Sequence, residues 1–357
     1  MKICIVLGTR PEIIKMSPII SLCEERQLDY YVIHTGQHYS YNMDEVFFEQ
    51  LRLPHPKYSL GIGSGSHGFQ TGKMLEKIEE ILVSDPVDVV LVQGDTNTVL
   101  AGSLAASKLN VKLGHVEAGL RSFDSSMPEE INRRVSDHVS DYLFAPTETS
   151  RKYLQNEGIS EVTIHVIGNT VVDALYRNIE FSIDVGDVLL DTLGLKKKKY
   201  FLVTAHRAEN VDNRKRFSMI LQSLDLIAEK YELDVIYPIH PRSQKMIETY
   251  SLKSNYVQFI DPLGYFEFIQ LLNNAKLVLT DSGGIQEESC VLGVPCVTLR
   301  DNTERPETIE AGSNILSGVE PDNILSCVSD MFEKKNIWIN PYGDGNTSKK
   351  ILEIIGV

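Results

Sequence analysis

The sequence predicts an α/β protein made of two doubly wound domains, each built on a parallel sheet. Along its 357 residues, short apolar runs of strand type alternate with longer amphipathic stretches of helix type. The alternation runs through two rounds, which are separated by a more polar stretch at 179–195 and by four lysines at 196–199. The chain is long enough for two hydrophobic cores. Ligands of such sheets bind beyond the carboxyl ends of the strands, so the residues that follow each strand are the candidates for function.

Residues 1–170 are expected to form the N-terminal domain. The first apolar run ends at Gly8, and Pro11 suits the first turn of the helix that follows. A glycine-rich segment at 58–68 is predicted to be a flexible connector or a lid. The predicted strands are 2–8, 29–36, 88–93, 112–117, 142–145 and 163–167, and the predicted helices are 11–26, 69–83, 97–109, 129–139 and 147–156.

Residues 171–345 are expected to form the C-terminal domain, which repeats the alternation. The lysine run at 196–199 is expected to be a solvated loop before its first strand. A last helix, within 346–357, is expected to pack back on the N-terminal domain. The predicted strands are 200–204, 234–238, 257–260, 277–279 and 295–299, and the predicted helices are 216–231, 244–250, 265–274, 285–292, 306–311 and 323–333.

Composition excludes several classes of function. The net charge of −14 argues against nucleic acid and against an anionic membrane surface as partners, although cations gathered locally could still bind a small anion. The 5 cysteines are odd in number and include no Cys-x-x-Cys pair, which favours a reduced, cytoplasmic protein. No signal peptide is visible, and no apolar run approaches the ~18–20 residues that a membrane span needs.

The segment 280–288 is the strongest single motif, because it joins a predicted strand to a predicted helix through Ser282, Gly283 and Gly284. Adjacent glycines let backbone N–H groups approach a ligand, and a helix start carries unpaired N–H groups and partial positive charge. The segment is therefore a candidate phosphate site. Glu288, one turn further on, could accept hydrogen bonds from a sugar diol. The alternative is a tight turn with a serine N-cap.

The first strand is followed by the sequence Gly-Thr-Arg-Pro-Glu-Ile-Ile-Lys at 8–15. This sequence matches neither G-x-G-x-x-G nor the Walker motif, which disfavours a dinucleotide site or NTP hydrolysis. Arg10 and Lys15 would both face the ligand edge from the first turn, where they could neutralise phosphate. The alternative is a helix start with a solvated arginine and lysine.

Other ionisable residues follow other strands. Asp95 ends one strand, although helix N-capping is a common role for aspartate. Glu117 shares a strand face with His115, which is harder to explain as structure. Glu129 opens a helix, where an acid is also favourable for the helix dipole. His206 ends the first strand of the second domain beside an arginine, although a lone histidine is more often structural than catalytic.

No metal or cofactor site is predicted. The 9 histidines include no H-E-x-x-H motif and no close pairing with cysteine. A G-x-S-x-G elbow for serine hydrolysis is also absent from the sequence. The candidate chemistry therefore belongs to carboxylates, a histidine and backbone N–H groups.

Together these motifs resemble the non-hydrolysing UDP-N-acetylglucosamine 2-epimerases, over nearly the whole chain and in order. The resemblance implies the two-domain fold of GT-B glycosyltransferases, no cofactor or metal, and a cytosolic homodimer that feeds surface polysaccharide synthesis. The implied reaction interconverts UDP-GlcNAc and UDP-ManNAc. The matching segments are GTRPE at 8–12, QGDT at 93–96, HVEAGLR at 115–121, PEE at 128–130, NR at 132–133, TDSGGIQEE at 280–288 and RDNTERPE at 300–307.

The resemblance also implies a route and roles. A base removes H2 while UDP leaves C1, which gives 2-acetamidoglucal; UDP then adds back with a proton on the opposite face. Asp95, Glu117 and Glu129 are the implied acid and base candidates, with His206 as a further catalytic residue. The diphosphate would be bound by Arg10, His206, Ser282, Gly283 and Gly284, and the rest of the UDP site would include Lys15, Glu288 at the ribose, Phe268 and Leu263 near uracil, and Arg305.

Bacterial members of the family use a second UDP-GlcNAc as an activator beside the active site. A similar pocket is implied here by Gln37, His38, Gln70, Arg207 and His240. Two positions depart from the family pattern: Leu263 stands where glutamine is frequent, and Ser40 where a long polar residue is usual. Activation by substrate would give sigmoidal kinetics with UDP-GlcNAc and slow turnover of UDP-ManNAc supplied alone.

Three other interpretations remain open at the level of sequence. A GT-B glycosyltransferase would bind a UDP-sugar in the same way, but it would have no use for several carboxylates around C2. A non-catalytic nucleotide-sugar sensor would not need to keep Asp95, Glu117, Glu129 and His206 together. A 2-epimerase of a modified sugar, such as a 2,3-diacetamido uronate, would keep the same chemistry and change only the sugar pocket.

Overall fold

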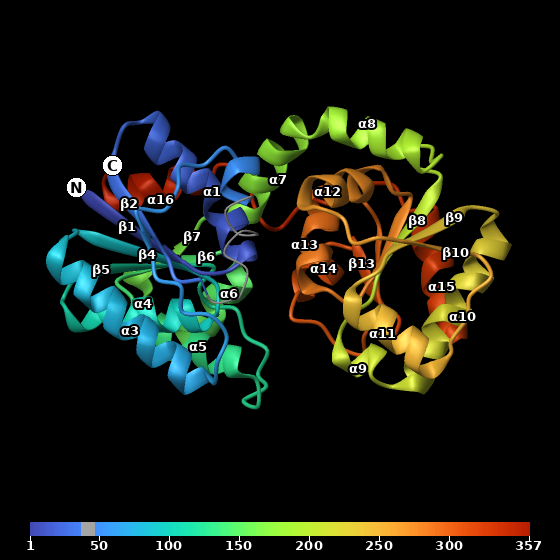
Figure 1. The fold of residues 1–357 in the computed structure, drawn as a ribbon, viewed down its shortest axis with the longest axis horizontal. Coiled ribbons are helices and arrows are strands. Elements are labelled where there is room, and N and C mark those ends of the chain that lie inside the picture. The colour runs from blue at the N-terminus through green and yellow to red at the C-terminus, as the bar shows by residue number, and fades with distance from the viewer. Residues whose placement is uncertain (37–46) are drawn as a thin grey trace. The chain divides into compact units, whose positions relative to one another are not determined.

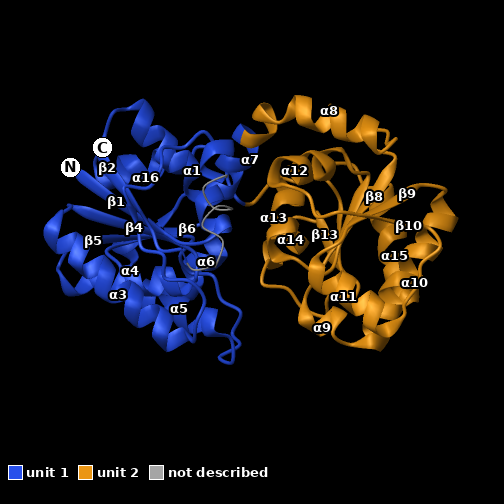
Figure 2. Ribbon diagram, in the orientation of Figure 1, with its two compact units in different colours: residues 1–177, 342–357 blue, residues 178–341 orange. Residues whose placement is uncertain are grey.

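The chain folds into two compact units, which Figure 2 colours separately. The structure is a computed structural model and describes residues 1–36 and 47–357. Unit 1 comprises Met1–Arg177 and Tyr342–Val357, and unit 2 comprises Asn178–Pro341. The chain therefore leaves unit 1 within helix α7 (Thr170–Phe181) and returns to it for its last helix.

Unit 1 contains a seven-stranded sheet in the order β3-β2-β1-β4-β5-β6-β7, in which every neighbouring pair is parallel. Its central strands β1 and β4 are apolar except for Lys2 at the start of β1 and Gln93 at the end of β4, as expected for a sheet covered on both faces. The strands are β1 (Lys2–Leu7), β2 (Asp29–His34), β3 (Tyr58–Ser59), β4 (Val89–Gln93), β5 (Lys112–Val116), β6 (Tyr142–Ala145) and β7 (Ile164–Val166).

Helices cover both faces of this sheet (Figure 1). On one face Met74 and Ile78 of α3 join Val99 and Ala105 of α4 in a core with alternate residues of the strands. On α16, Ile351 is fully buried, and this C-terminal helix packs against α1. The helices are α1 (Arg10–Glu25), α3 (His67–Ser84), α4 (Asn97–Lys108), α5 (Pro128–Val139), α6 (Glu148–Asn156), the 3-10 turn Glu161–Thr163, and α16 (Thr347–Ile355).

Unit 2 contains a six-stranded parallel sheet in the order β10-β9-β8-β11-β12-β13. The strands are β8 (Tyr200–Thr204), β9 (Asp234–Pro238), β10 (Val257–Ile260), β11 (Leu277–Thr280), β12 (Cys296–Thr298) and β13 (Asn314–Leu316). The helices are α8 (Ile183–Thr192), α9 (Ala208–Val211), α10 (Arg214–Tyr231), α11 (Pro241–Tyr250), α12 (Tyr265–Asn274), α13 (Gly283–Val291), α14 (Pro306–Glu310) and α15 (Pro321–Phe332).

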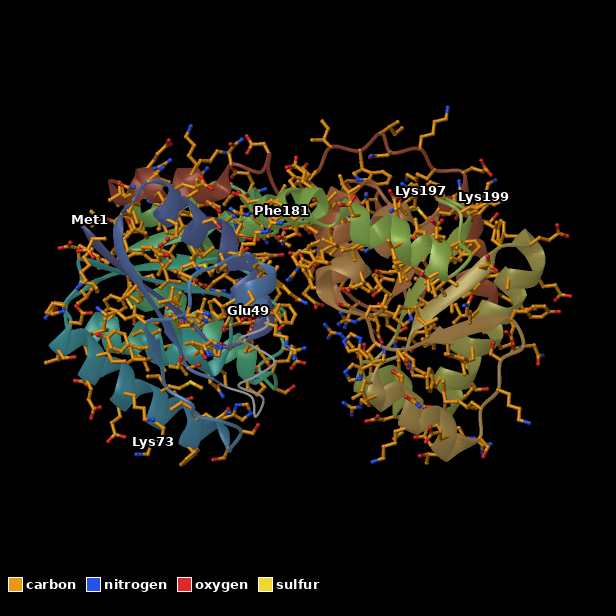
Figure 3. The ribbon with its side chains drawn as sticks, turned by 45° about the horizontal axis from the view of Figure 1, so that its top comes forward. Met1, Glu49, Lys73, Phe181, Lys197 and Lys199 are labelled. Atoms are coloured by element: carbon orange, nitrogen blue, oxygen red, sulfur yellow. The ribbon has the colours of Figure 1, made fainter. Side chains whose placement is uncertain are left out.

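The two sheets confirm the predicted fold class, although several helices and strands were not predicted. The stretch 179–195, which was described only as more polar and for which no helix was predicted, holds the end of α7 and all of α8. Gly186 weakens the helical signal of α8, but a Cβ there would lie 2.6 Å from the Gln270 side chain on α12. The short strands β3 and β13 were also missed. The lysines 196–199 are exposed before β8, as expected, and Figure 3 labels Lys197 and Lys199.

Each sheet has one point where the strand order reverses, and this is where doubly wound folds bind ligands. In unit 1 the reversal lies between β1 and β4, whose ends lead to Thr9 and Gly94. In unit 2 it lies between β8 and β11, whose ends lead to Ala205 and Asp281. The turns that follow these four strands therefore hold the residues of interest in each unit.

Within the described part of the chain, no helix combines the length and apolar character that crossing a membrane would require.

Replacing Gly168 with alanine is predicted to destabilise unit 1 strongly. Gly168 has a φ of +98°, and a Cβ would lie 2.7 Å from the Tyr342 carbonyl oxygen, where the chain returns to unit 1. Gly158 has a φ of +83° with no atom within 4 Å of such a Cβ, so Gly158→Ala is the matched control. We expect Gly158→Ala to cost ~1 kcal/mol from backbone strain alone.

Urea unfolding followed by circular dichroism should show a clearly larger loss of stability for Gly168→Ala than for Gly158→Ala. Equal losses would mean that the contact with the returning segment does not constrain unit 1.

Candidate functional site

The turn between β11 and α13 is built to present backbone N–H groups. The Ser282 N–H is bonded back to Thr280 Oγ1 at 3.0 Å, and the helix begins at Gly283. The N–H groups of the first helical turn have no carbonyl one turn before them, so they are available to an anion. Gly283 lies close to Glu304, since a Cβ there would lie 2.6 Å from Glu304 Oε1. The Gly284 position is exposed.

Asp281 ties this turn to the one after β8. Its fully buried carboxylate accepts the His206 N–H at 3.0 and 3.1 Å and the Arg207 N–H at 3.0 Å. The same group also accepts from Asn210 Nδ2 at 3.2 Å and lies 3.4 Å from His206 Nδ1. The His206 ring itself is part-exposed. Asp281 therefore fixes both the backbone and one ring nitrogen of His206 beside the Ser282–Gly284 turn.

Arginines and acids alternate around this edge of unit 2. Glu304 accepts from Arg300 Nη1 at 2.7 Å and from Arg207 Nη2 at 2.9 Å. Burial alone would raise the pKa of Glu304, but Arg305, Arg300 and Arg207 outweigh burial and lower it to about 2. Arg305 Nε lies 2.6 Å from Oε1 of Glu287, which is fully buried. The ion pair with Glu287 therefore holds the Arg305 side chain in place.

The residues of unit 2 that are expected to contact the uracil and the ribose lie on one side of the sheet. Leu263, Phe268 and Ile285 are half-buried and pack against the same hydrophobic cluster. Glu288 is half-buried on α13, and its charge acts on Tyr265. Ile285 directly follows the Ser282–Gly284 turn on α13, and Phe268 of α12 packs against the same cluster. Apolar side chains and the Glu288 carboxylate therefore lie near this turn within unit 2.

In unit 1, Asp95 follows β4 and is held by Arg133 of α5. Arg133 Nε and Nη2 both donate to Asp95 Oδ2, at 3.0 and 2.6 Å, and the Asn132 side chain donates to the Asp95 carbonyl at 2.9 Å. About a third of the Asp95 side chain (32%) is exposed, so the carboxylate remains open to a ligand. Asp95 is not an N-cap, because Thr96 holds that position on α4.

Glu117 is the most constrained carboxylate of unit 1. It is 6% exposed and accepts from Lys15 Nζ at 2.7 and 2.9 Å, from Asn169 Nδ2 at 3.2 Å, and from Gln93 Nε2. Its φ of +71° is in the left-handed region, which is uncommon for residues other than glycine and is concentrated at functional sites. A Cβ on Gly94 would lie 3.9 Å from Glu117 Oε2, so Glu117 lies close to the turn that carries Asp95.

Glu12 organises the first turn of unit 1. Its carboxylate accepts the N–H groups of Gly8 and Thr9 at 2.6 and 2.8 Å and the Thr96 hydroxyl at 2.5 Å. Burial raises the pKa of Glu12 to about 7, against the lowering effect of these hydrogen bonds. Arg10 lies on the same turn, with its guanidinium carbon 5.0 Å from the centre of the Phe47 ring.

Glu129 and Glu130 differ in burial and in hydrogen bonding. Glu130 is 1% exposed and accepts from Arg133 at 3.0 Å and from the Ser122 N–H at 2.9 Å. Burial alone would raise the pKa of Glu130, but these donors lower it. Glu129 is half-buried, and its carboxylate has no hydrogen bond or ion pair with the residues that the structure describes. Of the two, only Glu129 is left to meet a ligand.

The implied activator pocket lies only partly within the described residues. Gln37 and His38, together with Ser40, lie outside them. Gln70 is buried and bridges the Gly63 carbonyl and Asn97 Nδ2, at 2.8 and 3.0 Å. In unit 2 the ring centres of His240 and His206 are 5.5 Å apart, and Arg207 is the partner of Glu304.

Sequence reasoning missed the supporting residues of both units. Gln93, Arg133 and Asn169 contact the candidate carboxylates directly, and Glu12 and Asp281 hold the turns. Arg133 and Asp281 stand inside recognised motifs, so a signal existed for them. Asn169 had none, because it reaches Glu117 from 52 residues away. Among residues 1–36 and 47–357, no group of three or more metal-ligating side chains is assembled.

Known proteins of similar sequence indicate the same family. Residues 21–356 match the family model described as UDP-N-acetylglucosamine 2-epimerase. The chain belongs to the UDP-N-acetylglucosamine 2-epimerase family. It is 53% identical, over 361 residues, to a UDP-N-acetylglucosamine 2-epimerase of Methanococcus maripaludis, with 99% of this chain and 98% of the relative covered. The predicted family resemblance is thereby confirmed.

Solved structures agree with this family assignment. The crystal structure of Methanocaldococcus jannaschii UDP-GlcNAc 2-epimerase in complex with UDP-GlcNAc and UDP matches with a TM-score of 0.89 at 52% identity, over 99% of both chains. A glycosyltransferase of Rickettsia africae matches with a TM-score of 0.61 at 15% identity, over 99% of this chain and 97% of that one, which shows a shared fold. A UDP-2,3-diacetamido-2,3-dideoxy-D-glucuronate 2-epimerase of Pseudomonas aeruginosa is 42% identical over 369 residues, covering 99% of each.

The lowered pKa of Glu304 predicts a pH-dependent contribution to stability. The ordinary pKa of 4.5 in the unfolded chain exceeds the value of about 2 in the folded one, so the ionised group stabilises the fold above the unfolded value. This contribution is lost as the pH falls from ~5 towards 2. Glu304→Gln should therefore cost ~1–3 kcal/mol at neutral pH and progressively less in acid.

Urea unfolding of the wild type and of Glu304→Gln between pH 7 and pH 3 measures this difference. Glu310→Gln is the control, since Glu310 is exposed at the end of the neighbouring α14. A stability difference that stays constant with pH would contradict the charge-based explanation.

Proposed function

We propose that this chain is a non-hydrolysing UDP-N-acetylglucosamine 2-epimerase that interconverts UDP-GlcNAc and UDP-ManNAc. The observation that carries the proposal is the pair of carboxylates Asp95 and Glu117 on neighbouring strand ends of unit 1. Arg133 holds the Asp95 carboxylate, Lys15 and two side-chain amides hold that of Glu117, and Glu117 has a left-handed backbone. A protein that only bound or transferred a UDP-sugar would not need such a pair.

The chemistry follows from the weak acidity of the C2 hydrogen. Simple removal and return of this proton is slow, whereas elimination of UDP from C1 gives a neutral 2-acetamidoglucal. A base takes the C2 proton as the C1–oxygen bond breaks, and the bond electrons leave with the diphosphate. Addition of UDP with protonation from the opposite face then gives the epimer. No cofactor or metal takes part in this sequence of steps.

Unit 2 would hold the leaving group. The N–H groups at Ser282, Gly283 and Gly284 would donate to the diphosphate, and oriented N–H groups stabilise charge that develops there during the reaction. His206, fixed by Asp281, would donate to the same group. The other proposed UDP contacts are Glu288 at the ribose, Phe268 and Leu263 at uracil, Arg305 on the far side, and Arg10 and Lys15 from unit 1.

Unit 1 would hold the acids and bases. Asp95, Glu117 and Glu129 are the candidates, and a positioned group of this kind contributes ~10²–10⁴-fold to a rate. Lys15 has a second proposed effect, since its ammonium donates to both oxygens of the Glu117 carboxylate and orients it. Glu130 is proposed to be structural because its carboxylate is buried among arginines.

A 2-epimerase of a modified UDP-sugar is the alternative with a specific observation in its favour. The relative from Pseudomonas aeruginosa that is named for a 2,3-diacetamido uronate is 42% identical to this chain. Identity of 53% with relatives named for UDP-GlcNAc favours the plain sugar. We also propose that the protein is a cytoplasmic homodimer serving surface polysaccharide synthesis, and light scattering in solution tests the dimer.

Incubation with UDP-GlcNAc alone in D₂O tests the proposal. We expect UDP-ManNAc to appear with deuterium at C2, detected by proton NMR and mass spectrometry. A glycosyltransferase would need an acceptor and would leave C2 unlabelled. Conversion of the 2,3-diacetamido uronate but not of UDP-GlcNAc would favour the alternative substrate.

Asp95→Asn and Glu117→Gln are predicted to abolish most epimerisation while leaving UDP binding largely intact. Neither carboxylate is assigned to the nucleotide, and each loss should be roughly 10²–10⁴-fold in kcat. Glu76→Gln, on the exposed surface of α3, is the control. Initial rates and calorimetric titration with UDP make the two measurements. Near-normal turnover in both variants would show that the wrong carboxylates were chosen.

A further inference from the structure

His115, two residues before Glu117, has both ring nitrogens engaged. It is fully buried on β5; its Nδ1 lies 2.7 Å from Asp137 Oδ1 and its Nε2 lies 2.8 Å from the Gly94 carbonyl oxygen. A carbonyl oxygen can only accept, so Nε2 must carry a hydrogen. Nδ1 must carry the second hydrogen if Asp137 is ionised. The question is therefore the charge state of Asp137.

The surroundings of Asp137 require the ionised form. Its second oxygen, Oδ2, lies 2.7 Å from Arg121 Nη1 and accepts the Gly119 N–H at 3.3 Å. Burial alone would raise the pKa of Asp137, but His115 and Arg121 outweigh burial and lower it. Both oxygens of this buried carboxylate therefore accept hydrogen bonds. His115 is accordingly an imidazolium, with a hydrogen on each nitrogen.

The charged groups around the ring balance one another. Asp137 comes from α5 and Arg121 from the segment after β5, and Glu157 after α6 binds Arg121 at 2.7 and 2.8 Å. Burial alone would lower the pKa of His115, and Arg121 acts in the same direction. Asp137 and the Gly94 carbonyl outweigh both, so the pKa of His115 is raised. Removing the Asp137 charge would leave the lowering influences opposed only by the Gly94 carbonyl.

This ion pair holds the two turns that carry the candidate acids. The Nε2 contact fixes the carbonyl of Gly94, whose φ is +87° and which directly precedes Asp95. The Asp137 contact fixes the N–H of Gly119, whose φ is +81°, just after Glu117. Both turns depart from regular strand geometry at these points. The buried pair therefore contributes to the relative placement of the two turns, through backbone groups next to Asp95 and Glu117.

We propose that His115, kept doubly protonated by Asp137, is a positioning residue that sets the Gly94–Asp95 turn against Glu117 for proton transfer. The proposal rests on the proposed function, since it assigns the pair a part in that reaction. A merely structural pair would affect stability but would add no titration to kcat. A positioning pair makes the rate depend on the charge of His115, because a neutral ring would have to give up one of its two contacts.

The protonation state is measured directly on the whole protein by ¹⁵N-histidine NMR. We expect His115 to show two protonated ring nitrogens at pH 8, with assignment by loss of the signal in His115→Gln. His138 is the internal comparison, since it is exposed on α5. A neutral His115 ring at pH 8 would overturn the proposal whatever the enzyme activity, so this failure is distinct from failure of the proposed function.

The kinetic test compares Asp137→Asn with the wild type across pH. The asparagine oxygen can accept from Nδ1 only while the ring is charged, and it supplies no charge of its own. The ring should therefore become neutral in the working range and lose the Nδ1 hydrogen bond. We expect kcat of the variant to fall by roughly 10- to 10²-fold as pH rises through this titration, with KM nearly unchanged. The wild type should lack that extra step. His138→Gln, the control, should behave as the wild type.

His115→Gln provides the second arm, because Asp137→Asn also removes a partner of Arg121 and could fail to fold. This variant should lose roughly 10²-fold in kcat at every pH, with UDP binding preserved. A wild-type kcat and pH profile in His115→Gln would overturn the positioning role. A folded Asp137→Asn with a wild-type pH profile would overturn it as well.

Discussion

A buried carboxylate that accepts hydrogen bonds from backbone N–H groups lies at the ligand edge of each sheet, and the candidate residues of each unit depend on this interaction. In unit 1, Glu12 holds Gly8 and Thr9 and reaches across to Thr96 beside Asp95. In unit 2, Asp281 holds His206 and Arg207 beside the Ser282–Gly284 turn. Each joins the two turns at the reversal of its strand order. Each carboxyl group accepts several hydrogen bonds at once, which keeps these irregular turns fixed.

These anchors explain why catalysis can be built on loops. Turns that carry functional groups expose backbone polar groups and would otherwise be mobile. Here the buried carboxylates of Glu12 and Asp281 hold the turns in place, and other groups on the same turns stay accessible to a ligand. Asp95 keeps about a third of its side chain (32%) exposed, and Gly284 is exposed at the helix start. A site that must hold a glucal and UDP together through two steps needs such pre-set groups.

The sequence predicted the repeated pattern of the fold and the residues proposed to meet a ligand, because both follow from local rules. Apolar runs identified most strands, and residues after them identified Asp95, Glu117 and the glycine turn. It could not reveal Asn169 on Glu117 or Glu287 on Arg305, since those contacts arise from tertiary packing. Helix α8 was missed because Gly186 weakens its helical signal, although that glycine lets α8 approach α12. The reaction came from the family resemblance, because the spacing of apolar residues carries no information about chemistry.

In the proposed reaction, the bond between C1 and the diphosphate breaks and re-forms during epimerisation. Positional isotope exchange tests it most directly. UDP-GlcNAc labelled with ¹⁸O in the bridge between C1 and the β-phosphorus is incubated with the protein, and ³¹P NMR follows the label. If the bond breaks, label should move from the bridge to non-bridging β-phosphate positions as UDP-ManNAc forms. Epimerisation with the label retained entirely in the bridge would contradict it.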